Sequence, residues 1–239
     1  MKSRYMLVLA IDTCDVNGSV ALLRAGEVVG TTAHRGSEGY SSWLLPTVDG
    51  LLKASDANLN DLNLFAVATG PGSFTGVRIG LTTVKAWGEV FGKPIAGMSR
   101  LEVLAAQASS EAPFVATFID AQRGQVFGAL YKRDGPDLVL VGDEAVASGA
   151  EFLGGVDKEV GSGQVEWVST NPAVMGSTDA WQERAARGER VLEVSPVLAP
   201  LIGKLGIQKA AKGQLLDALS LDANYVRRSY VEVAAKSSQ

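Results

Sequence analysis

Two side chains, Cys14 and His34, have the reactivity that nucleophilic catalysis uses, and each is the only residue of its type in the chain. A cysteine attacks a carbonyl carbon as a thiolate, which a neighbouring histidine commonly generates. The two residues fall on different predicted elements, and we interpret Cys14 as a small buried filler. We expect His34, at the end of a predicted strand, to be a surface or interface residue without a chemical role.

The same two counts bear on metal binding. Protein zinc and iron sites collect three or four ligands from His, Cys and clustered carboxylates. One His and one Cys do not supply such a set. The sequence therefore predicts no catalytic residue and no metal ligand in this chain.

A glycine-rich turn, GPGSFTG, precedes a predicted helix within residues 68–92. Backbone N–H groups at a helix N-terminus bind phosphate in many proteins. Here Pro71 removes one donor, and the motif has no lysine to reach a phosphate. We interpret the loop as structural, with Ser73 or Thr75 as the helix cap.

The helix predicted over residues 75–91 has more apolar surface than one sheet would cover. Val77, Leu81 and Val84 form the expected core stripe, at about 100° per residue, and a polar stripe lies beside it. The remaining surface, which should face water, carries small and apolar side chains: Gly76, Ile79, Gly80, Thr82, Thr83, Ala86, Trp87 and Val90. This pattern predicts a second contact, either with another helix of the same chain or with another subunit.

Composition limits the classes of protein to which this chain can belong. The chain has 239 residues, is 46% hydrophobic and carries a net charge of −4, which fits one long domain or two smaller ones. Only Arg227, Arg228 and Lys236 approach a basic stripe, so any nucleic acid should be held mainly by another molecule. No apolar run reaches the roughly 20 residues of a membrane span, no signal peptide is recognised, and a lone thiol suits the cytoplasm.

The chain contains an internal repeat. Residues 6–33 and 114–142 each read as a three-stranded meander whose first strand ends in Ile-Asp, at Asp12 and Asp120. Each meander precedes helical material, which predicts two α/β halves, each with a mixed sheet, over residues 1–108 and 109–239. The first half should contain helices 42–54 and 75–91, and a helix over 99–109, capped by Ser99, should link the halves.

The second half has a weaker pattern after its meander. It predicts a helix around 147–152, a strand at 166–169, and helices near 180–187 and 197–211. The second half is therefore expected to be degenerate, with the C-terminal helices belonging to it.

Duplicated halves of this plan resemble the actin, Hsp70 and sugar-kinase (ASKHA) superfamily. Within it, IDTCDVNGSVALL, GPGSFTGVRIG and IDAQRGQVFGALY resemble the TsaB (also called YeaZ) family, over about residues 6–132. The resemblance implies a non-catalytic subunit that dimerises with a TsaD-like transferase in making threonylcarbamoyladenosine on tRNA. It also implies a TsaE-like ATPase in the complete complex, ATP and metal on the partner subunits, and only indirect contact with tRNA.

The resemblance also implies which sites this chain has lost. Transferase members hold a metal with paired histidines, which a single histidine cannot supply. Kinase and ATPase members wrap phosphate with the turn after the first strand, but here that turn, TCDVNG, places Asp15 where phosphate would lie. Asp12 and Thr13 are therefore expected to form a vestigial nucleotide turn. Gly161 and Gly163 are either the remnant of a second such turn or a simple hairpin turn.

We expect the first half to bind its partner through helices 75–91 and 42–54. The predicted interface residues are Trp43, Gly50, Thr75, Gly76, Ile79, Gly80, Thr82, Thr83, Ala86 and Trp87. Without that partner the same face should form a homodimer. The substitution Gly80→Arg is expected to weaken association and leave the fold intact.

Two other functions remain open at this point. A free-standing ASKHA-type ATPase or kinase would need Asp12 and the Gly161 turn to bind ATP and magnesium. A homodimeric binding module unrelated to tRNA would use the same apolar face without a transferase.

Overall fold

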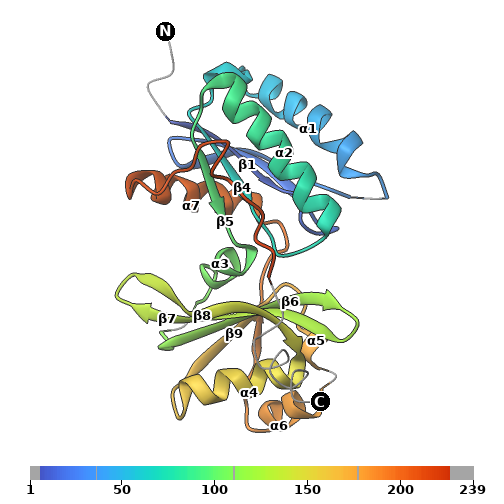
Figure 1. The fold of residues 1–239 in the computed structure, drawn as a ribbon, viewed down its shortest axis with the longest axis vertical. Helices are drawn as coiled ribbons and strands as arrows, with labels where there is room; N and C mark the ends of the chain where they lie inside the picture. The colour runs from blue at the N-terminus through green and yellow to red at the C-terminus, as the bar shows by residue number, and fades with distance from the viewer. Residues whose placement is uncertain (1–5, 36, 110, 177, 227–239) are drawn as a thin grey trace. The chain divides into compact units, whose positions relative to one another are not determined.

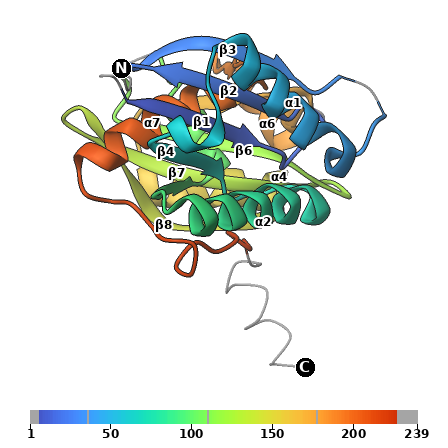
Figure 2. The same ribbon diagram turned by 90° about the horizontal axis from the view of Figure 1, so that it is seen from above.

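The computed structural model describes residues 6–35, 37–109, 111–176 and 178–226. It divides into two compact units, Met1–Val103 with Pro196–Asn224, and Leu104–Ser195 with Tyr225–Gln239. Figures 1 and 2 show the ribbon from two directions. None of the helices in these described ranges is long and apolar enough to cross a membrane. The basic residues Arg227, Arg228 and Lys236 lie outside them.

The first unit is built on a five-stranded mixed sheet. Its strand order is β3 (Glu27–Ala33), β2 (Ser19–Arg24), β1 (Leu7–Asp12), β4 (Leu64–Ala68) and β5 (Ile95–Met98). The first three strands form an antiparallel meander, and β4 and β5 run parallel to β1. Every residue of β1 is buried, as expected for a central strand that is covered on both faces.

Helices cover both faces of this first sheet. Helices α1 (Tyr40–Ala54) and α2 (Phe74–Phe91) lie on one face, and α7 (Ala199–Ala211) lies on the other (Figures 1 and 2). Close contacts of three helical glycines fix this arrangement: Gly80 of α2 lies against Val67, and Gly203 and Gly206 of α7 lie against Leu23 and Ala66. Val67 and Ala66 are neighbours on β4, so their side chains point to opposite faces.

The second unit repeats the same sheet topology. Its strand order is β8 (Asp137–Ser148), β7 (Gln125–Asp134), β6 (Phe114–Gln122), β9 (Val165–Ser169) and β10 (Val191–Glu193). Helices α4 (Gly149–Val160), α5 (Ala173–Gly176) and α6 (Asp179–Ala186) supply its helical layer (Figure 1). Phe118, Phe152, Trp167 and Trp181 form much of its core. The predicted duplication and the α/β class are therefore confirmed.

The division between the units differs from the predicted halves, 1–108 and 109–239. Helix α7 packs on the first sheet, so the C-terminal helical material does not all belong to the second unit. The physical reason is the pair of glycines on α7, which lets its backbone approach β1, β2 and β4 closely. The hydrophobic periodicity of a helix shows which face is buried, but not which of two sheets that face covers.

Two helix boundaries also differ from the prediction. Helix α3 (Arg100–Ala105) is shorter than residues 99–109; Ser99 Oγ accepts from Leu101 N, but Glu102 pairs with Lys209 instead of closing a capping box. Helix α4 continues to Val160, and Ser148 and Glu151 form its capping box. A one-turn helix, η1 (Leu59–Asp61), leads into β4.

Candidate functional site

Helix α2 begins at a tightly held loop. Ser73 N donates to Cys14 O at 2.7 Å, and Ser73 Oγ accepts from Gly76 N at 3.3 Å as the N-cap. The helix ends at Gly92, whose φ of 58° is the left-handed conformation typical of a C-cap glycine. The GPGSFTG loop therefore acts in this unit as the structural turn that aims α2, as the sequence predicts.

The small residues Gly76 and Gly80 have an internal explanation. A Cβ on Gly76 would lie 2.0 Å from Thr13 O, and one on Gly80 would lie 2.5 Å from Thr13 Oγ1. Both glycines are buried and face the first sheet and its turn. Their predicted placement in a partner interface is therefore wrong, and so is the expectation that Gly80→Arg would leave the fold intact. The small residues allow α2 to approach the turn after β1.

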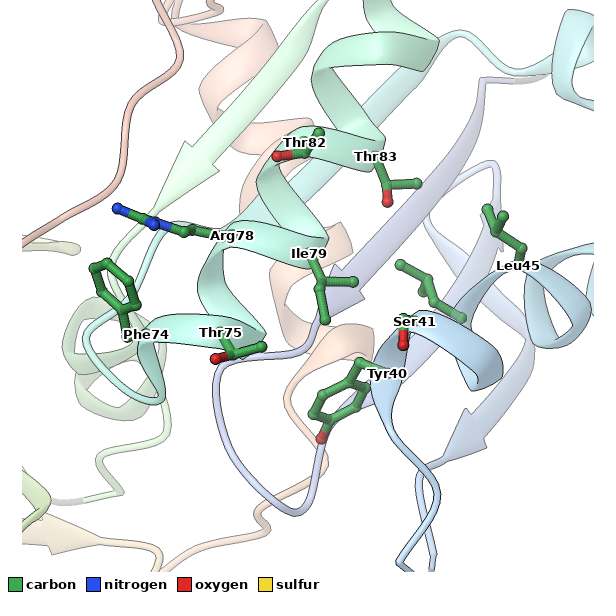
Figure 3. Close-up of a pocket in the computed structure, with 10 residues that line it drawn as sticks. Tyr40, Ser41, Leu45, Phe74, Thr75, Arg78, Ile79, Thr82 and Thr83 are labelled. Atoms are coloured by element: carbon green, nitrogen blue, oxygen red, sulfur yellow. The ribbon is translucent and has the colours of Figure 1, made fainter.

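A groove of about 520 Å³ lies between α1 and α2 on the surface of the first unit (Figure 3). Ile79 and Thr83 of α2 point toward α1 in that view, whereas Phe74 and Arg78 lie along the other edge of α2. The complete lining is Tyr40, Ser41, Leu44, Leu45, Phe74, Thr75, Arg78, Ile79, Thr82 and Thr83. Four predicted interface residues, Thr75, Ile79, Thr82 and Thr83, belong to it.

Three groove residues give this surface its chemical character. Leu45 and Phe74 are 53% and 56% exposed, although both are large and apolar. The Arg78 guanidinium carbon lies 3.6 Å from the centre of the Phe74 ring, so the edge of the groove carries a cation on an aromatic face. An apolar groove with hydroxyl groups and one cation at its edge suits a protein partner better than it suits a small polar substrate.

The other predicted interface residues lie outside the groove. The Trp87 ring stacks on Phe65 at 5.7 Å, and Trp43 packs against His34 at 5.2 Å, so both rings contribute to the packing of their own unit. Gly50 and Ala86 are exposed on α1 and α2 without lining the groove. Two large aromatic rings that the sequence pattern assigns to an interface are thus half-buried on their own core.

The turn after β1 is closed by an arginine that the sequence pattern does not reveal. The Arg100 side chain is 2% exposed; its Nε lies 3.3 Å from Asp12 Oδ2 and its Nη2 lies 3.1 Å from Asp15 Oδ2. Asp12 Oδ1 also accepts from Cys14 N at 2.8 Å, so this carboxylate caps the turn. A buried carboxylate that is already paired with a guanidinium is poorly placed to hold magnesium or activate water.

Burial and neighbouring charges also shift the pKa values of Arg100 and Cys14. Burial lowers the pKa of Arg100, but the charges of Asp12, Cys14 and Asp15 and the hydrogen bond to Asp15 together raise it more, so the net direction is upward. Desolvation and the charge of Asp12 raise the pKa of the Cys14 thiol, whose Sγ lies 3.5 Å from Ala68 O. Thr13 Oγ1 donates to Gly76 O at 2.7 Å. Cys14 is thus the buried filler that the sequence predicts, and Thr13 connects the turn to α2.

His34 is buried and contacts two loops, contrary to the predicted surface or interface position. It is 8% exposed, and its Nδ1 and Nε2 lie 3.1 Å and 2.7 Å from the carbonyl oxygens of Val16 and Glu38. Its ring packs on Tyr40 at 4.6 Å between centroids. Because both nitrogens face backbone carbonyls, the imidazole holds two loops together.

In the second unit, the equivalent turns are also structural. Asp120 Oδ1 accepts from Gln122 N at 2.6 Å, repeating the contact that Asp12 makes with Cys14. Gly161 is the C-cap of α4, and Gly163 N donates to Val160 O at 3.1 Å. The interpretation of the Gly161 turn as a hairpin is therefore wrong, because it joins a helix to β9. Within the described ranges, no group of three or more His, Cys, Asp or Glu side chains is arranged to hold a metal.

Two units with the same five-strand order, each a meander plus two parallel strands, define an α/β protein of the ASKHA class. Residues 27–193 match the family model described as TsaD, tRNA N6-adenosine threonylcarbamoyltransferase, and the chain belongs to this family, in its TsaB (YeaZ) branch.

Curated relatives carry the same family name. The chain is 39% identical over 127 residues to the tRNA threonylcarbamoyladenosine biosynthesis protein TsaB of Bacillus subtilis, a match that covers 53% of this chain and 56% of that protein. It is 29% identical over 232 residues to the protein of the same name in Escherichia coli, which covers 94% and 96%. The chain thus spans about half the length of the first relative and nearly all of the second.

Solved structures agree with this placement. YeaZ from Pseudomonas aeruginosa is 26% identical, with a TM-score of 0.69 over 92% of this chain and 100% of that one. A protein described as similar to peptidase YeaZ from Pseudomonas aeruginosa is 25% identical, with a TM-score of 0.71 over 93% and 100%.

Proposed function

We propose that this chain is a non-catalytic scaffold subunit that pairs with a TsaD-like transferase in threonylcarbamoyladenosine modification of tRNA, in the cytoplasm. The names of the Bacillus and Escherichia relatives support a role in the biosynthesis of threonylcarbamoyladenosine on tRNA. The observation that carries the pairing is the groove between α1 and α2, with Leu45 and Phe74 more than half exposed. Covering such side chains with a partner removes apolar surface from water.

The groups in the first unit support an accessory role over a catalytic one. Cys14 is 1% exposed with a raised pKa, so it is a poor nucleophile for a peptidase. Asp12 is paired with Arg100, and His34 contacts two backbone carbonyls. In this proposal ATP and metal bind to the partner subunits, including a TsaE-like ATPase, and tRNA contacts this chain only indirectly.

A scaffold subunit acts on its enzyme through differential binding. The chain stabilises the active arrangement of the transferase only to the extent that it binds that arrangement more tightly than the inactive one. Without the transferase, the same groove is proposed to cover itself in a homodimer. The transferase and a second copy would then compete for one surface.

A binding titration tests the pairing. The purified chain is titrated with the TsaD-like transferase of the same organism, and Leu45→Asp is compared with the wild type. We expect Leu45→Asp to bind at least about 100-fold more weakly, because an unpaired carboxylate in a closed interface loses roughly 3 kcal/mol or more. Leu219→Asp is the matched control: Leu219 is 90% exposed and does not line the groove.

Other results of these binding measurements would favour one of the alternative functions or a different interface. Wild-type chain that dimerises but never binds the transferase would favour a homodimeric binding module unrelated to tRNA. Tight binding of ATP and magnesium by the isolated chain in calorimetry would favour a free-standing ATPase or kinase. Equal binding by wild type and Leu45→Asp would place the interface away from the groove.

A further inference from the structure

The buried Arg100 contacts two segments that the chain places far apart in sequence. Its guanidinium pairs with Asp12 and Asp15 in the turn after β1. Its Nη1 lies 3.4 Å from Pro71 O, and its backbone N donates to Gly70 O at 2.7 Å. One side chain thus connects the turn after β1 to the loop that precedes α2.

Burying a guanidinium stabilises a core poorly, because removing its charge from water costs free energy. Replacing a buried ion pair by apolar side chains of similar volume is often neutral or stabilising, so the pair itself is weak evidence of stability. Buried ion pairs are better suited to fixing one geometry among several, since a charge pair is satisfied in few arrangements. The informative feature of Arg100 is therefore the set of segments whose geometry it fixes.

The turn that Arg100 holds is attached to both helices of the groove. Cys14 O accepts from Ser73 N at 2.7 Å, and Thr13 Oγ1 donates to Gly76 O, so the turn is bonded to the first turn of α2. Tyr40 Oη donates to Asp15 O and accepts from Gly18 N, so the same turn is bonded to the first residue of α1.

The helix ends that meet this turn also form one end of the groove. Tyr40 begins α1, Phe74 and Thr75 begin α2, and all three side chains line the groove (Figure 3). We propose that Arg100 is a positioning residue for the groove, which sets the separation of α1 and α2 through Asp12 and Asp15 without touching the partner. The positioning of the helices preorganises the groove for binding. That the groove binds the transferase rests on the proposed function.

Two variants test the inference. Asp15→Asn removes one ion pair and keeps the buried pair between Arg100 and Asp12, so the first unit should fold. Arg100→Lys keeps the charge but cannot reproduce the fork of donors that contacts Asp12, Asp15 and Pro71. The matched control is Asp157→Asn in the second unit, which removes an exposed carboxylate from the buried Arg184 in the same way.

Hydrogen exchange of the isolated chain gives the readout that does not depend on a partner. We expect amides of residues 40–44 and 74–78 to exchange at least about tenfold faster in Asp15→Asn and Arg100→Lys, with residues 84–91 of α2 unchanged. Asp157→Asn should change neither segment. Uniformly faster exchange across the first unit, or no change at the helix starts, would overturn the positioning role.

Affinity for the transferase gives the second readout. We expect both Arg100→Lys and Asp15→Asn to bind about tenfold more weakly than wild type while remaining folded, and Asp157→Asn to bind like wild type. Equal loss in Asp157→Asn would mean a general stability effect and would overturn the inference. If wild-type chain does not bind the transferase at all, the proposed function fails, and hydrogen exchange still decides whether Arg100 positions the helices.

Discussion

The internal explanation for the glycines of α2 makes a direct prediction about Gly76. In Gly76→Ala, the new Cβ would lie 2.0 Å from Thr13 O, which is far inside contact distance. The obstacle is backbone, so α2 or the turn after β1 must move. Overpacking of this kind typically costs about 1 to 3 kcal/mol, and alanine returns about 1 kcal/mol through its helix propensity. Displacing Gly76 O also weakens its bond from Thr13 Oγ1, about 1 kcal/mol.

The net expectation is that Gly76→Ala lowers the free energy of unfolding by about 2 kcal/mol. Gly50→Ala is the matched control, because Gly50 lies inside α1 and a methyl group at this position would have no atom within 4 Å. That change should raise the free energy of unfolding by about 0.5 to 1 kcal/mol. Urea denaturation of the two variants, followed by circular dichroism, measures the difference.

The comparison separates two explanations of the same residue pattern. If Gly76 were small because a partner lies against it, Gly76→Ala would stabilise the isolated chain as Gly50→Ala does, and would weaken only association. Equal stabilisation by the two substitutions would therefore refute the packing of α2 against Thr13.

Three further predictions follow from single groups. Cys14 should react with a thiol reagent only slowly in the native chain at pH 8 and fully after denaturation, because burial and Asp12 raise its pKa; fast native reaction would contradict its burial. Desolvation raises the pKa of Tyr40 to about 12, so its contribution to stability is fully present below about pH 10 and is lost as the pH rises through about 12. Tyr40→Phe should flatten the alkaline fall in stability in a pH series, and an unchanged slope would count against this assignment. Ser148→Ala should lower the free energy of unfolding by about 1 kcal/mol in urea denaturation by opening the capping box of α4, and a change within error would show that the box contributes nothing.

The sheets, and the turns that follow the first strand of each, could be predicted from the sequence because they depend on local pattern. Apolar strands ending in Ile-Asp predicted both meanders. In the structure the two carboxylates Asp12 and Asp120 cap the following turns with the same contact. The glycine-rich loop before α2 likewise has the structural role expected from its proline and its lack of lysine.

The groove could be predicted only in part, because residues on the second face of α2 are small or apolar for two different reasons. Thr75, Ile79, Thr82 and Thr83 line the groove, while Gly76 and Gly80 are small to fit Thr13. A helical projection shows which residues are small or apolar, but not whether a neighbouring turn of the same chain already fills that space.

Arg100 and α7 could not be placed from local pattern at all. An arginine at the start of a predicted helix reads as solvated, and only the tertiary meeting of three loops reveals that it is buried against Asp12 and Asp15. Helix α7 likewise crosses back to the first sheet, which depends on contacts far apart in the sequence.

Docking of a transferase on the groove between α1 and α2 is tested most directly by hydrogen exchange of the chain, measured alone and in saturating TsaD-like transferase. We expect slower exchange in residues 40–45 and 74–83 of the complex, with residues 149–160 of α4 unchanged. Protection confined to the second unit, or no protection anywhere in a complex that does form, would contradict docking on this groove.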